Sequence, residues 1–597
     1  MKKFQLFAFA LAAGLMMGCS DDNSLVEGPS TGSSTTGKGY ISLAINLPSQ
    51  PSSRANDNFD DGTAEEYNVK DATLFVFEGT SEDAAVFTGA YDLDGIGNPS
   101  NVGGNITTTY QLTQEITRPE HENENVYALV TVNDNNIVNA GANAAEGWQI
   151  NNTGITAGTT TVANVKDMIA TVDVAQLANT ADKGYFFMTN APLYTTPGGA
   201  NDPTGGSVVT LTEIDPNNIF TTEEEAKANP AASVYVERAV AKVSVVAGEN
   251  LATAGGLATE IAGWALDMTN TKTYIVRNVD GANWWGYASK LNPTADRYRF
   301  VGSNPVATNL YRTYWGIDPN YDGNGYTLPG EFNNAIGGIP TTLKAAGAAD
   351  YCLENTFNVA NQNQNQTTRV IVAADLTVTG QDADSKDFYV INNLKDNILN
   401  KEGLDKAVKA AYLQNATVVA ALQNPTSGLD DPNTGLGEDD LTVTYSSTDE
   451  GGYIDVAEVT IKDASVSKFK GDVVPAILTA AGNDAIIAEI NADNSIAYYK
   501  GGRSYYPVMV KHFGDDSTPW TAGGATSYPE PNADQNWLGR WGVLRNNWYE
   551  ISVNSITEIG YPEVPEVYGT PDDPVESWIS VEINVLSWAK RTQSADL

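Results

Sequence analysis

The sequence is poor in the residues that most often carry catalytic or metal chemistry. It has two cysteines, Cys19 and Cys352, and two histidines, His121 and His512. Two cysteines cannot build a disulfide framework, so packing has to hold the fold together. With two histidines, zinc sites and Ser/His/Asp catalytic machinery lack parts. No phosphate loop of the form G-x-x-x-x-G-K-[ST] is present. We therefore expect a protein that is not an enzyme and that uses no cofactor.

Positive charge is also scarce. The 597 residues include 34 Lys and Arg against 74 Asp and Glu, a formal net charge of −40. Such a surface repels phosphate backbones and anionic membranes, so nucleic acid is excluded as a partner. The acidity is otherwise the ordinary property of a solvated surface, and it favours solubility outside the cell.

The N-terminal residues have the pattern of a secretory leader. Lys2 and Lys3 precede an apolar run from Phe4 to Met17, which is long enough for a signal peptide and too short to span a bilayer. Gly18 then stands directly before Cys19. A small residue before cysteine is what lipoprotein signal peptidase requires, so Cys19 is the predicted site of lipid attachment. The alternative is an ordinary cysteine in a buried segment.

A tether and one isolated strand follow the leader. Residues 30–39 are rich in Ser, Thr and Gly and read as a flexible linker. Residues 41–47 then alternate, with apolar side chains at Ile41, Leu43, Ile45 and Leu47. Arg54, the first arginine of the chain, comes shortly after, and Ala55 follows it. This order suggests a leader that is removed by cutting, although position alone would also allow a chance arginine in a loop.

The rest of the chain is dominated by β patterns. Its length predicts two large domains or a few smaller ones, and the Pro- and Asn-rich residues 215–230 are the best candidate boundary. Strands rich in branched and aromatic residues are predicted at 69–77, 126–133, 185–188, 207–211, 233–245, 442–445 and 457–461. Helical spacing occurs at 402–422 and 474–492. The predicted class is mainly β, with two β-sandwich domains and helical insertions in the second.

The last strand is the most regular of all. Residues 577–588 alternate strictly, with apolar side chains at Ile579, Val581, Ile583 and Val585, and Trp588 follows. A strand at this position usually pairs within its own domain, and from the pattern alone that is the ordinary interpretation.

One motif resembles the first half of a calcium loop. Asp318, Asn320 and Asp322 supply oxygen atoms at positions one, three and five, and Gly323 stands at position six. Position twelve is Pro329, which cannot provide the bidentate carboxylate, and Glu331 comes two residues late. A turn held by Asp and Asn side chains is the better interpretation, so we expect no metal and keep calcium as a weak candidate.

Several motifs together resemble the Bacteroidales fimbrillins, and among them the shaft fimbrillins of the minor (short) fimbriae. The resemblance is carried by Arg238–Val243, Gly263–Asn270, Arg312–Tyr321 and Gly542–Glu550, and it extends from about Tyr40 to Leu597. The acidic residues after Cys19, Ser20–Asn23, likewise resemble the export tag of surface lipoproteins in the Bacteroides group.

The resemblance implies two transthyretin-like β-sandwich domains and a definite maturation path. Residues 1–19 would be the lipoprotein signal peptide, and 20–54 a propeptide made of the tether and the first strand. Residues 55–230 and 231–597 would be the two domains. A trypsin-like surface protease would cut between Arg54 and Ala55, and removal of the covering strand would open a groove. The donor strand within residues 577–597 of a neighbour would fill that groove by β-augmentation.

The partners implied by this resemblance are copies of the same chain, anchor and tip accessory fimbrillins, the protease, and host or bacterial surface receptors. The expected location is a fimbrium at the cell surface, with the precursor anchored to the outer membrane as a lipoprotein, and the expected roles are adhesion and biofilm formation. The rival interpretation is a monomeric surface lipoprotein that binds glycans through Trp284 and Trp285. A surface glycan hydrolase with a carboxylate pair is a third.

Overall fold

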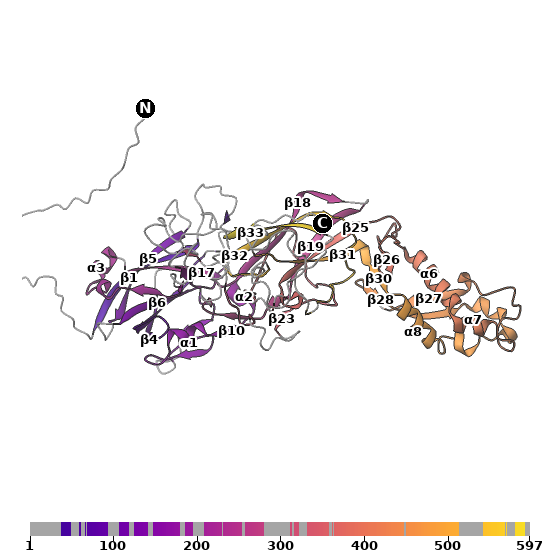
Figure 1. Cartoon of the computed structure of the whole chain (residues 1–597), viewed down its shortest axis with the longest axis horizontal. Helices are drawn as coiled ribbons and strands as arrows, with labels where there is room; N and C mark the ends of the chain where they lie inside the picture. Colours follow the sequence, from indigo (N-terminus) through magenta and orange to yellow (C-terminus); the bar gives the residue numbers. More distant parts are fainter. Residues whose placement is uncertain are drawn as a thin grey trace, which may run out of the picture.

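The computed structural model describes residues 37–48, 59–60, 66, 68–93, 107–118, 124–140, 147–179, 185–194, 208–229, 231–253, 257–279, 311–312, 316–321, 331–357, 361, 363–446, 449–512, 541–567, 569 and 579–591. The described chain is elongated (Figure 1), and three hydrophobic cores follow one another along its length. The fold is mainly β, as the sequence predicts.

The first core is built on the largest sheet. Its order is β4-β3-β6-β13-β17-β1-β5, and one further strand, β16, also pairs with β6. The strands are β1 (Lys38–Pro48), β3 (Ala72–Gly79), β4 (Val86–Asp92), β5 (Thr107–Thr117), β6 (Asn125–Val132), β13 (Met188–Asn190), β16 (Thr212–Ile214) and β17 (Ala232–Arg238). In the two central strands β3 and β6 nearly every residue is buried, so both faces of the sheet are covered.

Short strands and helices surround this sheet. Three-stranded pieces are β7-β8-β9 and β15-β14-β22, and two-stranded pieces are β10-β21 and β11-β12. Their bounds are β7 (Val138–Ala140), β8 (Trp148–Ile150), β9 (Thr153–Ile155), β10 (Ile169–Thr171), β11 (Ala178–Asn179), β12 (Tyr185–Phe186), β14 (Leu193–Tyr194), β15 (Val208–Val209), β21 (Lys272–Tyr274) and β22 (Tyr311–Arg312), with helices α1 (Val162–Lys166), α2 (Val174–Leu177) and α3 (Glu223–Ala228).

The second core lies between two further sheets, of order β2-β33-β32-β18-β24 and β19-β25-β31. The strands are β2 (Phe59–Asp60), β18 (Ala241–Thr253), β19 (Ala258–Asp267), β24 (Ala349–Cys352), β25 (Arg369–Thr377), β31 (Arg503–Met509), β32 (Asn547–Ile556) and β33 (Ile579–Arg591), with the small pair β20 (Thr269–Asn270) and β23 (Phe332–Asn333) beside them.

The chain passes from the first core to the second between β17 and β18. The pattern over residues 233–245 predicts one strand, but the structure has two, which meet at Ala239 and Val240. β17 pairs with β13 and β1 of the first sheet, while β18 pairs with β24 and β32 of the second. The division at residue 230 stays a proposal, and the sheets place the change of core after Arg238.

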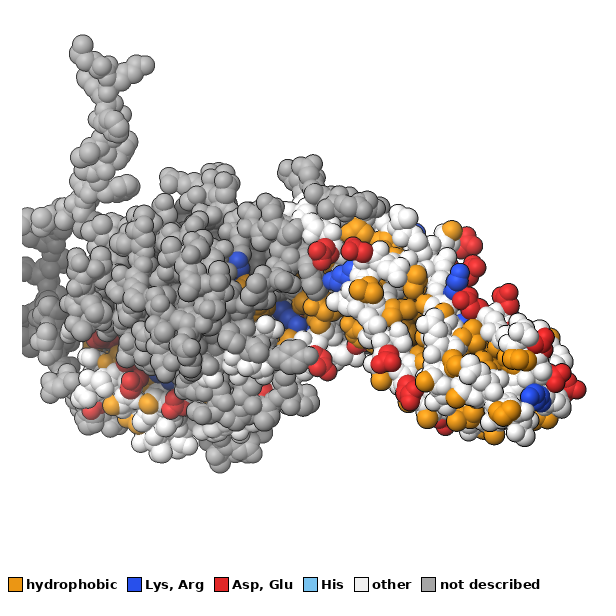
Figure 2. Space-filling view, turned by 45° about the vertical axis from the view of Figure 1, so that its right-hand side comes forward, with side chains coloured by type: hydrophobic (Ala, Val, Ile, Leu, Met, Phe, Trp, Pro, Cys, Tyr) orange, Lys and Arg blue, Asp and Glu red, His pale blue; other side chains and the backbone are white. Residues whose placement is uncertain are grey.

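The third core belongs to residues 378–502, which connect the neighbouring antiparallel strands β25 and β31. This insertion forms the right-hand end of the molecule in Figure 1. It contains α6 (Lys401–Gln414), α7 (Ala416–Leu422), α8 (Asp484–Asp493), β26 (Phe388–Ile391), β27 (Leu441–Tyr445), β28 (Gly452–Ile454), β29 (Val456–Ile461) and β30 (Ile496–Tyr499). Carboxylate side chains are spread over this end in Figure 2, where basic side chains are few.

The helical pattern over 402–422 is divided in the structure. Asn415 has φ −59° and ψ 132°, which ends α6, and its side chain then accepts hydrogen bonds from the backbone amides of Thr417 and Val418 at the start of α7. An asparagine in this capping position competes with continuation of the helix. Over 474–492 the helical part is confined to the turn η8 (Ala476–Leu478) and to α8. The other 3₁₀ turns are η2 (Pro216–Asn218), η4 (Gln364–Gln366), η5 (Glu438–Asp440), η6 (Asp463–Lys468), η7 (Lys470–Asp472) and η9 (Lys500–Gly502).

Candidate functional site

The predicted covering strand is an inner strand of the first sheet. β1 runs parallel to β17, with Leu43 opposite Ala232 and Ile45 opposite Val234. On its other side β1 pairs antiparallel with β5 along its whole length, from Lys38–Thr117 to Pro48–Thr107. Strands on both sides therefore hold β1, and its main-chain groups complete those of both neighbours.

The side chains of β1 help to close the first core. Ile41, Leu43 and Ile45 are at most 1% exposed and belong to that core, as predicted from their alternation. The side chain of Leu47 is outside the part that the structure describes. On the opposite face Ser42 is fully buried, and α3 packs against both β1 and β5. The slot that β1 fills therefore takes apolar side chains on one face and the buried Ser42 on the other.

Polar contacts fix the start of β1. The Tyr40 hydroxyl donates a 2.8 Å hydrogen bond to Glu115 Oε2 on β5, and Lys38 forms an ion pair with the same carboxylate. Lys38 and Tyr40 hold the pKa of Glu115 below its usual value. Because these groups lie at the surface, they contribute little to stability, and they set the register of β1 against β5.

The predicted donor strand lies in the second sheet of its own chain. β33 pairs antiparallel with β32, with Val581 opposite Val553, Ile583 opposite Ile551 and Val585 opposite Tyr549. Its other neighbour is the two-residue strand β2, where Phe59 pairs with Ala589 and Asp60 with Trp588. Among the residues that the structure describes, most of β33 is therefore paired on one side, with β32. In this single chain, the last strand therefore pairs within its own domain, which is the ordinary interpretation of its sequence pattern.

The residues predicted to be cut connect two different sheets. β1 ends at Pro48 in the first sheet, and β2 begins at Phe59 in the second. Arg54 and Ala55 come between them and lie outside the described residues, as does the predicted lipid site Cys19. A cut anywhere between residues 48 and 59 would leave β1 attached to the protein by noncovalent contacts alone.

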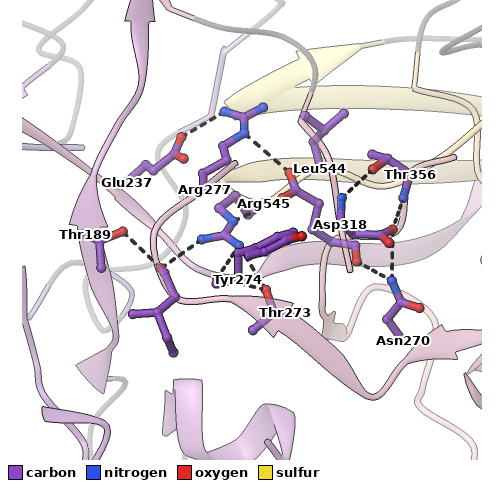
Figure 3. A network of polar contacts seen from close by, with 12 residues as sticks. Thr189, Glu237, Asn270, Thr273, Tyr274, Arg277, Asp318, Thr356, Leu544 and Arg545 are labelled. Carbon is purple, nitrogen blue, oxygen red and sulfur yellow. Dashed lines mark hydrogen bonds and ion pairs between the residues drawn. The ribbon is translucent and has the colours of Figure 1, made fainter. Parts of the chain in front are cut away.

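A buried cluster of charges lies between the first two cores (Figure 3). The carboxylate of Glu354 stands between two guanidinium groups, 3.4 Å from Arg277 Nε and 3.3 Å from Arg545 Nε. Arg277 also forms an ion pair with Glu237 at 3.2 Å. All four side chains are at most 2% exposed. Gly316 leaves room for the cluster, because a Cβ at that position would lie 2.9 Å from both Arg277 Nε and Glu354 Oε1.

Each arginine of the cluster is also tied to the main chain or to a second element. Arg545 donates to the carbonyl oxygen of Tyr274 at 2.7 Å and to Thr273 Oγ1 at 2.9 Å, beside β21. Glu237 belongs to β17 of the first sheet, whereas Arg545 precedes β32 of the second. The ion pairs therefore bridge the two cores. Removal of one partner would leave an uncompensated charge in a dry site.

A second ion pair lies at the same junction and involves Glu66, which comes six residues after the end of β2. Lys242 of β18 is 2.7 Å from Glu66 Oε1, and both side chains are 3% exposed. The Tyr351 hydroxyl donates to the same carboxylate, and Arg238 Nε donates to the Glu66 carbonyl oxygen at 2.7 Å. Burial and the adjacent carboxylate raise the pKa of Tyr351. Glu66 thus fixes the chain to the junction twelve residues after Arg54.

The candidate calcium residues take part in hydrogen bonds at this junction. Asp318 Oδ1 accepts from the backbone amide of Asn320 at 2.6 Å, and Oδ2 accepts from Asn270 Nδ2 at 3.1 Å and from the amide of Thr356. Asn320 Nδ2 donates to Asn270 Oδ1 at 2.9 Å. Asp322 is outside the described residues. Within the described part of the chain, no group of three or more His, Cys, Asp or Glu side chains could hold a metal ion.

The other cysteine and histidine residues that the structure describes are buried in the fold. Cys352 is fully buried, and burial raises the pKa of its thiol. His512 is buried with Nδ1 2.7 Å from the Tyr549 hydroxyl. His121, Trp284 and Trp285 lie outside the description. In the residues that the structure covers, no helix is both long enough and apolar enough to span a bilayer.

Sequence reasoning did not identify the charges at the junction or the pairing of β2 with β33. Arg238 and Arg545 stand within the motifs that carry the family resemblance, but their partners come from distant segments. Arg545 and Glu354 are 191 positions apart, from 545 − 354. Phe59 and Asp60 alone are too short to signal a strand. One signal was present in the sequence. Arginines are scarce in this chain, so an arginine within a strand motif could have been predicted to form an ion pair with a buried carboxylate.

Comparison with known proteins gives one match to a family model. Residues 497–594 match the model described as major fimbrial subunit protein type IV, fimbrillin, C-terminal. This range includes β31, β32 and β33, and with them the predicted donor strand. A search of the curated proteins finds no significant match.

Several solved structures are similar at low identity. The chain is 14% identical to the fimbrilin FimA of Porphyromonas gingivalis, covering 92% of this chain and 98% of that one, with a TM-score of 0.34. A candidate cell adhesion protein of Parabacteroides distasonis is 10% identical, with 93% and 98% covered and a TM-score of 0.35. The tip fimbrial protein Mfa3 of P. gingivalis is 14% identical, with 60% and 97% covered and a TM-score of 0.25.

The family match favours one of the classes that the sequence left open, a fimbrial subunit. A fimbrillin C-terminal region indicates a structural protein and not an enzyme. The predicted resemblance to the Bacteroidales fimbrillins is therefore confirmed over residues 497–594, the part of the chain that is similar to the fimbrillin C-terminal model.

Proposed function

We propose that the chain is a shaft subunit of a cell-surface fimbria, activated by cleavage after Arg54 and polymerised by strand insertion. The C-terminal strand of one copy would fill the slot that β1 leaves in the next copy. The observation that carries this proposal is the place of β1. A strand that precedes Arg54 in sequence is an inner strand of the first sheet, paired on both sides.

The energetics explain why the slot would need a new occupant. Ile41, Leu43 and Ile45 are buried, and each such side chain contributes roughly 1.5–3 kcal/mol, or about 5–9 kcal/mol together before ordering costs. Loss of β1 would also leave unpaired main-chain groups on β17 and β5. An open apolar slot with two free edges is a template for another strand.

β33 is suited to leave its own sheet. It forms the last long strand there, and among the described residues β2 alone pairs with its outer side, at two residue pairs. Its alternating residues Ile579, Val581, Ile583 and Val585 have the period that the slot requires. Once inserted, a strand is released slowly, so its unfolding rate and not its equilibrium affinity would set the lifetime of the filament.

Lipid attachment would bring the precursor to the surface before activation. The leader and the Gly18–Cys19 junction support Cys19 as the lipidated residue. Labelling cells with a fatty-acid analogue should mark the precursor, and Cys19→Ala should abolish the label. Assembly with anchor and tip subunits and adhesion to host or bacterial surfaces follow from the family resemblance.

The N-terminus of the assembled protein tests the proposal. Filaments purified from cells should contain chains that begin at Ala55, as read by chemical sequencing or mass spectrometry. The replacement Arg54→Ala should give precursor that is exported but does not polymerise, with Arg118→Ala, an arginine elsewhere in the first domain, as the matched control. Filaments whose chains still begin at Cys19 would refute the slot-opening step.

A further inference from the structure

The first and last strands that the structure describes have nearly the same sequence. Residues 41–47 read ISLAINL, and residues 579–585 read ISVEINV. Four of the seven positions are identical, namely the pairs 41/579, 42/580, 45/583 and 46/584, and two more exchange Leu for Val. Ala44 and Glu582 form the one unlike pair. An aromatic residue precedes both segments, Tyr40 in one and Trp578 in the other.

Alternation alone does not explain this likeness. Any half-buried strand carries apolar residues at every second position, which accounts for 41, 43, 45 and 47 and their counterparts. At the alternate positions of the sequence, Ser42 and Asn46, many polar residues would serve equally well. Ser580 and Asn584 nevertheless repeat them in the same places. The shared outer face suggests that both segments fit the same surroundings.

The surroundings of β1 give reasons for the residues on its outer face. Ser42 is fully buried on this face, which favours a small side chain there. Its carbonyl oxygen also accepts from the amide of Ala231 at 2.6 Å. Ala44 is only half-buried, and its neighbour on β17, Ser233, is exposed. A glutamate in the place of Ala44 can therefore reach water, so the unlike pair is accommodated.

We propose that residues 579–585 of one copy occupy the slot of the next copy in the register of residues 41–47. This inference rests on the strand exchange proposed above and adds its direction and alignment. The inserted strand runs parallel to β17 and antiparallel to β5. Val581 takes the place of Leu43, opposite Ala232, and Ile583 takes the place of Ile45, opposite Val234. The leader is then a covalently attached stand-in for the strand of a second copy.

Disulfide trapping in filaments tests the register directly. Glu582 takes the place of Ala44, which is paired with Ser233, so cysteines at 582 and 233 of adjacent copies would lie at the separation that a disulfide needs. Filaments of the double variant Glu582→Cys/Ser233→Cys should give a ladder of covalent multimers that collapses on reduction. The native Cys352 is fully buried, so its thiol should not form disulfides between copies.

The matched control shifts one cysteine by two residues on the same face. In the proposed register residue 584 takes the place of Asn46, which is paired with Tyr235. In the variant Asn584→Cys/Ser233→Cys the two cysteines are therefore two residues out of register, and little cross-linking is expected. A ladder from this control in place of the first variant would overturn the register, and so would filaments in which neither variant cross-links. Failure of the underlying strand exchange looks different, because filament chains would then retain residues 38–48.

A second experiment tests whether the two segments are interchangeable. The precursor with Leu43→Val, Ala44→Glu and Leu47→Val carries the donor sequence in its leader, and it should fold and be processed like the wild type. A control with Leu43→Glu and Ala44→Val has one added glutamate as well, but on the buried face, and should lose stability. An unfolded precursor from the first variant would show that the two segments do not fit the same slot.

Discussion

The terminal strands and the junction between the first two cores are held in different ways. β1 is held by main-chain pairing and apolar side chains, and β33 by main-chain pairing with β32 and a short contact with β2. The junction contains Glu237, Arg277, Glu354 and Arg545, all buried and charged. The terminal strands use main-chain pairing and alternating side chains, which a second strand of matching sequence can also provide, whereas the junction depends on particular charged partners.

This difference indicates which parts of a subunit can be exchanged. Strand addition uses the main chain for affinity and alternate side chains for specificity, so a second sequence can replace the first. A buried ion pair tolerates no such replacement, because loss of one partner leaves the other unpaired. Under the proposed strand exchange, the terminal strands would be exchanged while the buried ion pairs keep the first two cores in a fixed arrangement.

The largest effect is expected at the junction. Glu354→Ala would leave Arg277 and Arg545 without their shared carboxylate, and the free energy of unfolding should fall by about 3–5 kcal/mol. Glu331→Ala is the matched control, since Glu331 pairs with Lys272 in a partly exposed site and should cost about 1 kcal/mol or less. Chemical denaturation of both variants checks this. Equal losses would mean that the buried cluster has no special role.

A charge in the covering strand should have a large effect that depends on cleavage. Leu43→Asp puts a carboxylate into the first core, and the precursor should lose about 3 kcal/mol or more. Ala44→Asp, on the half-buried outer face, should be tolerated. In the mature protein, from which β1 is absent, the two variants should melt alike. A difference that persists after cleavage would show that β1 stays in place.

The smallest effect is a pH dependence that should not depend on cleavage. Burial raises the pKa of Asp134 to about 6, and the carboxylates of Asp71 and Asp92 lie near it. Its two oxygens accept hydrogen bonds from Thr73 and Thr131, both at 2.7 Å, which tie β3 to β6. The pKa of Asp134 is higher in the folded state, so its protonation stabilises the fold. This contribution to the free energy of unfolding is complete below about pH 3.8 and is lost as the pH rises through about 6.

The variant Asp134→Asn should remove that dependence. Relative to the wild type it should gain stability between pH 4 and pH 7.5, by the same amount in precursor and mature protein. Thermal melts at both pH values measure the difference. A gain confined to the precursor would connect Asp134 to the β1 slot, contrary to the comparison drawn here.

Local sequence predicted the strands better than it predicted their partners. The alternation of β1 and β33 and the buried runs of β3 and β6 are visible within a few residues, because burial on one face or two sets the period. The parallel pairing of β1 with β17 joins residues far apart in sequence, and nothing local encodes it. The split of the 402–422 helix at Asn415 was visible in principle, since asparagine is a preferred capping residue.

The candidate site was predictable only in part for the same reason. Ile41, Leu43 and Ile45 were recognised from their period, and the structure confirms their burial. The charges of the junction meet across long sequence separations, and their pairing depends on the tertiary fold. The contact of β2 with β33 involves two residue pairs, too few to leave a pattern in the sequence.

The most direct test of strand exchange uses a subunit that has an open slot and no strand of its own to offer. A chain that lacks residues 577–597, cleaved after Arg54, should stay folded and should capture a synthetic peptide of residues 577–597 with a rise in melting temperature. The uncleaved form should not capture it, because β1 fills the slot. A peptide with Val581→Asp should bind poorly, and one with Glu582→Lys should bind nearly as well as the original. A truncated chain that is unfolded, or a peptide that does not bind the cleaved form, would contradict the account.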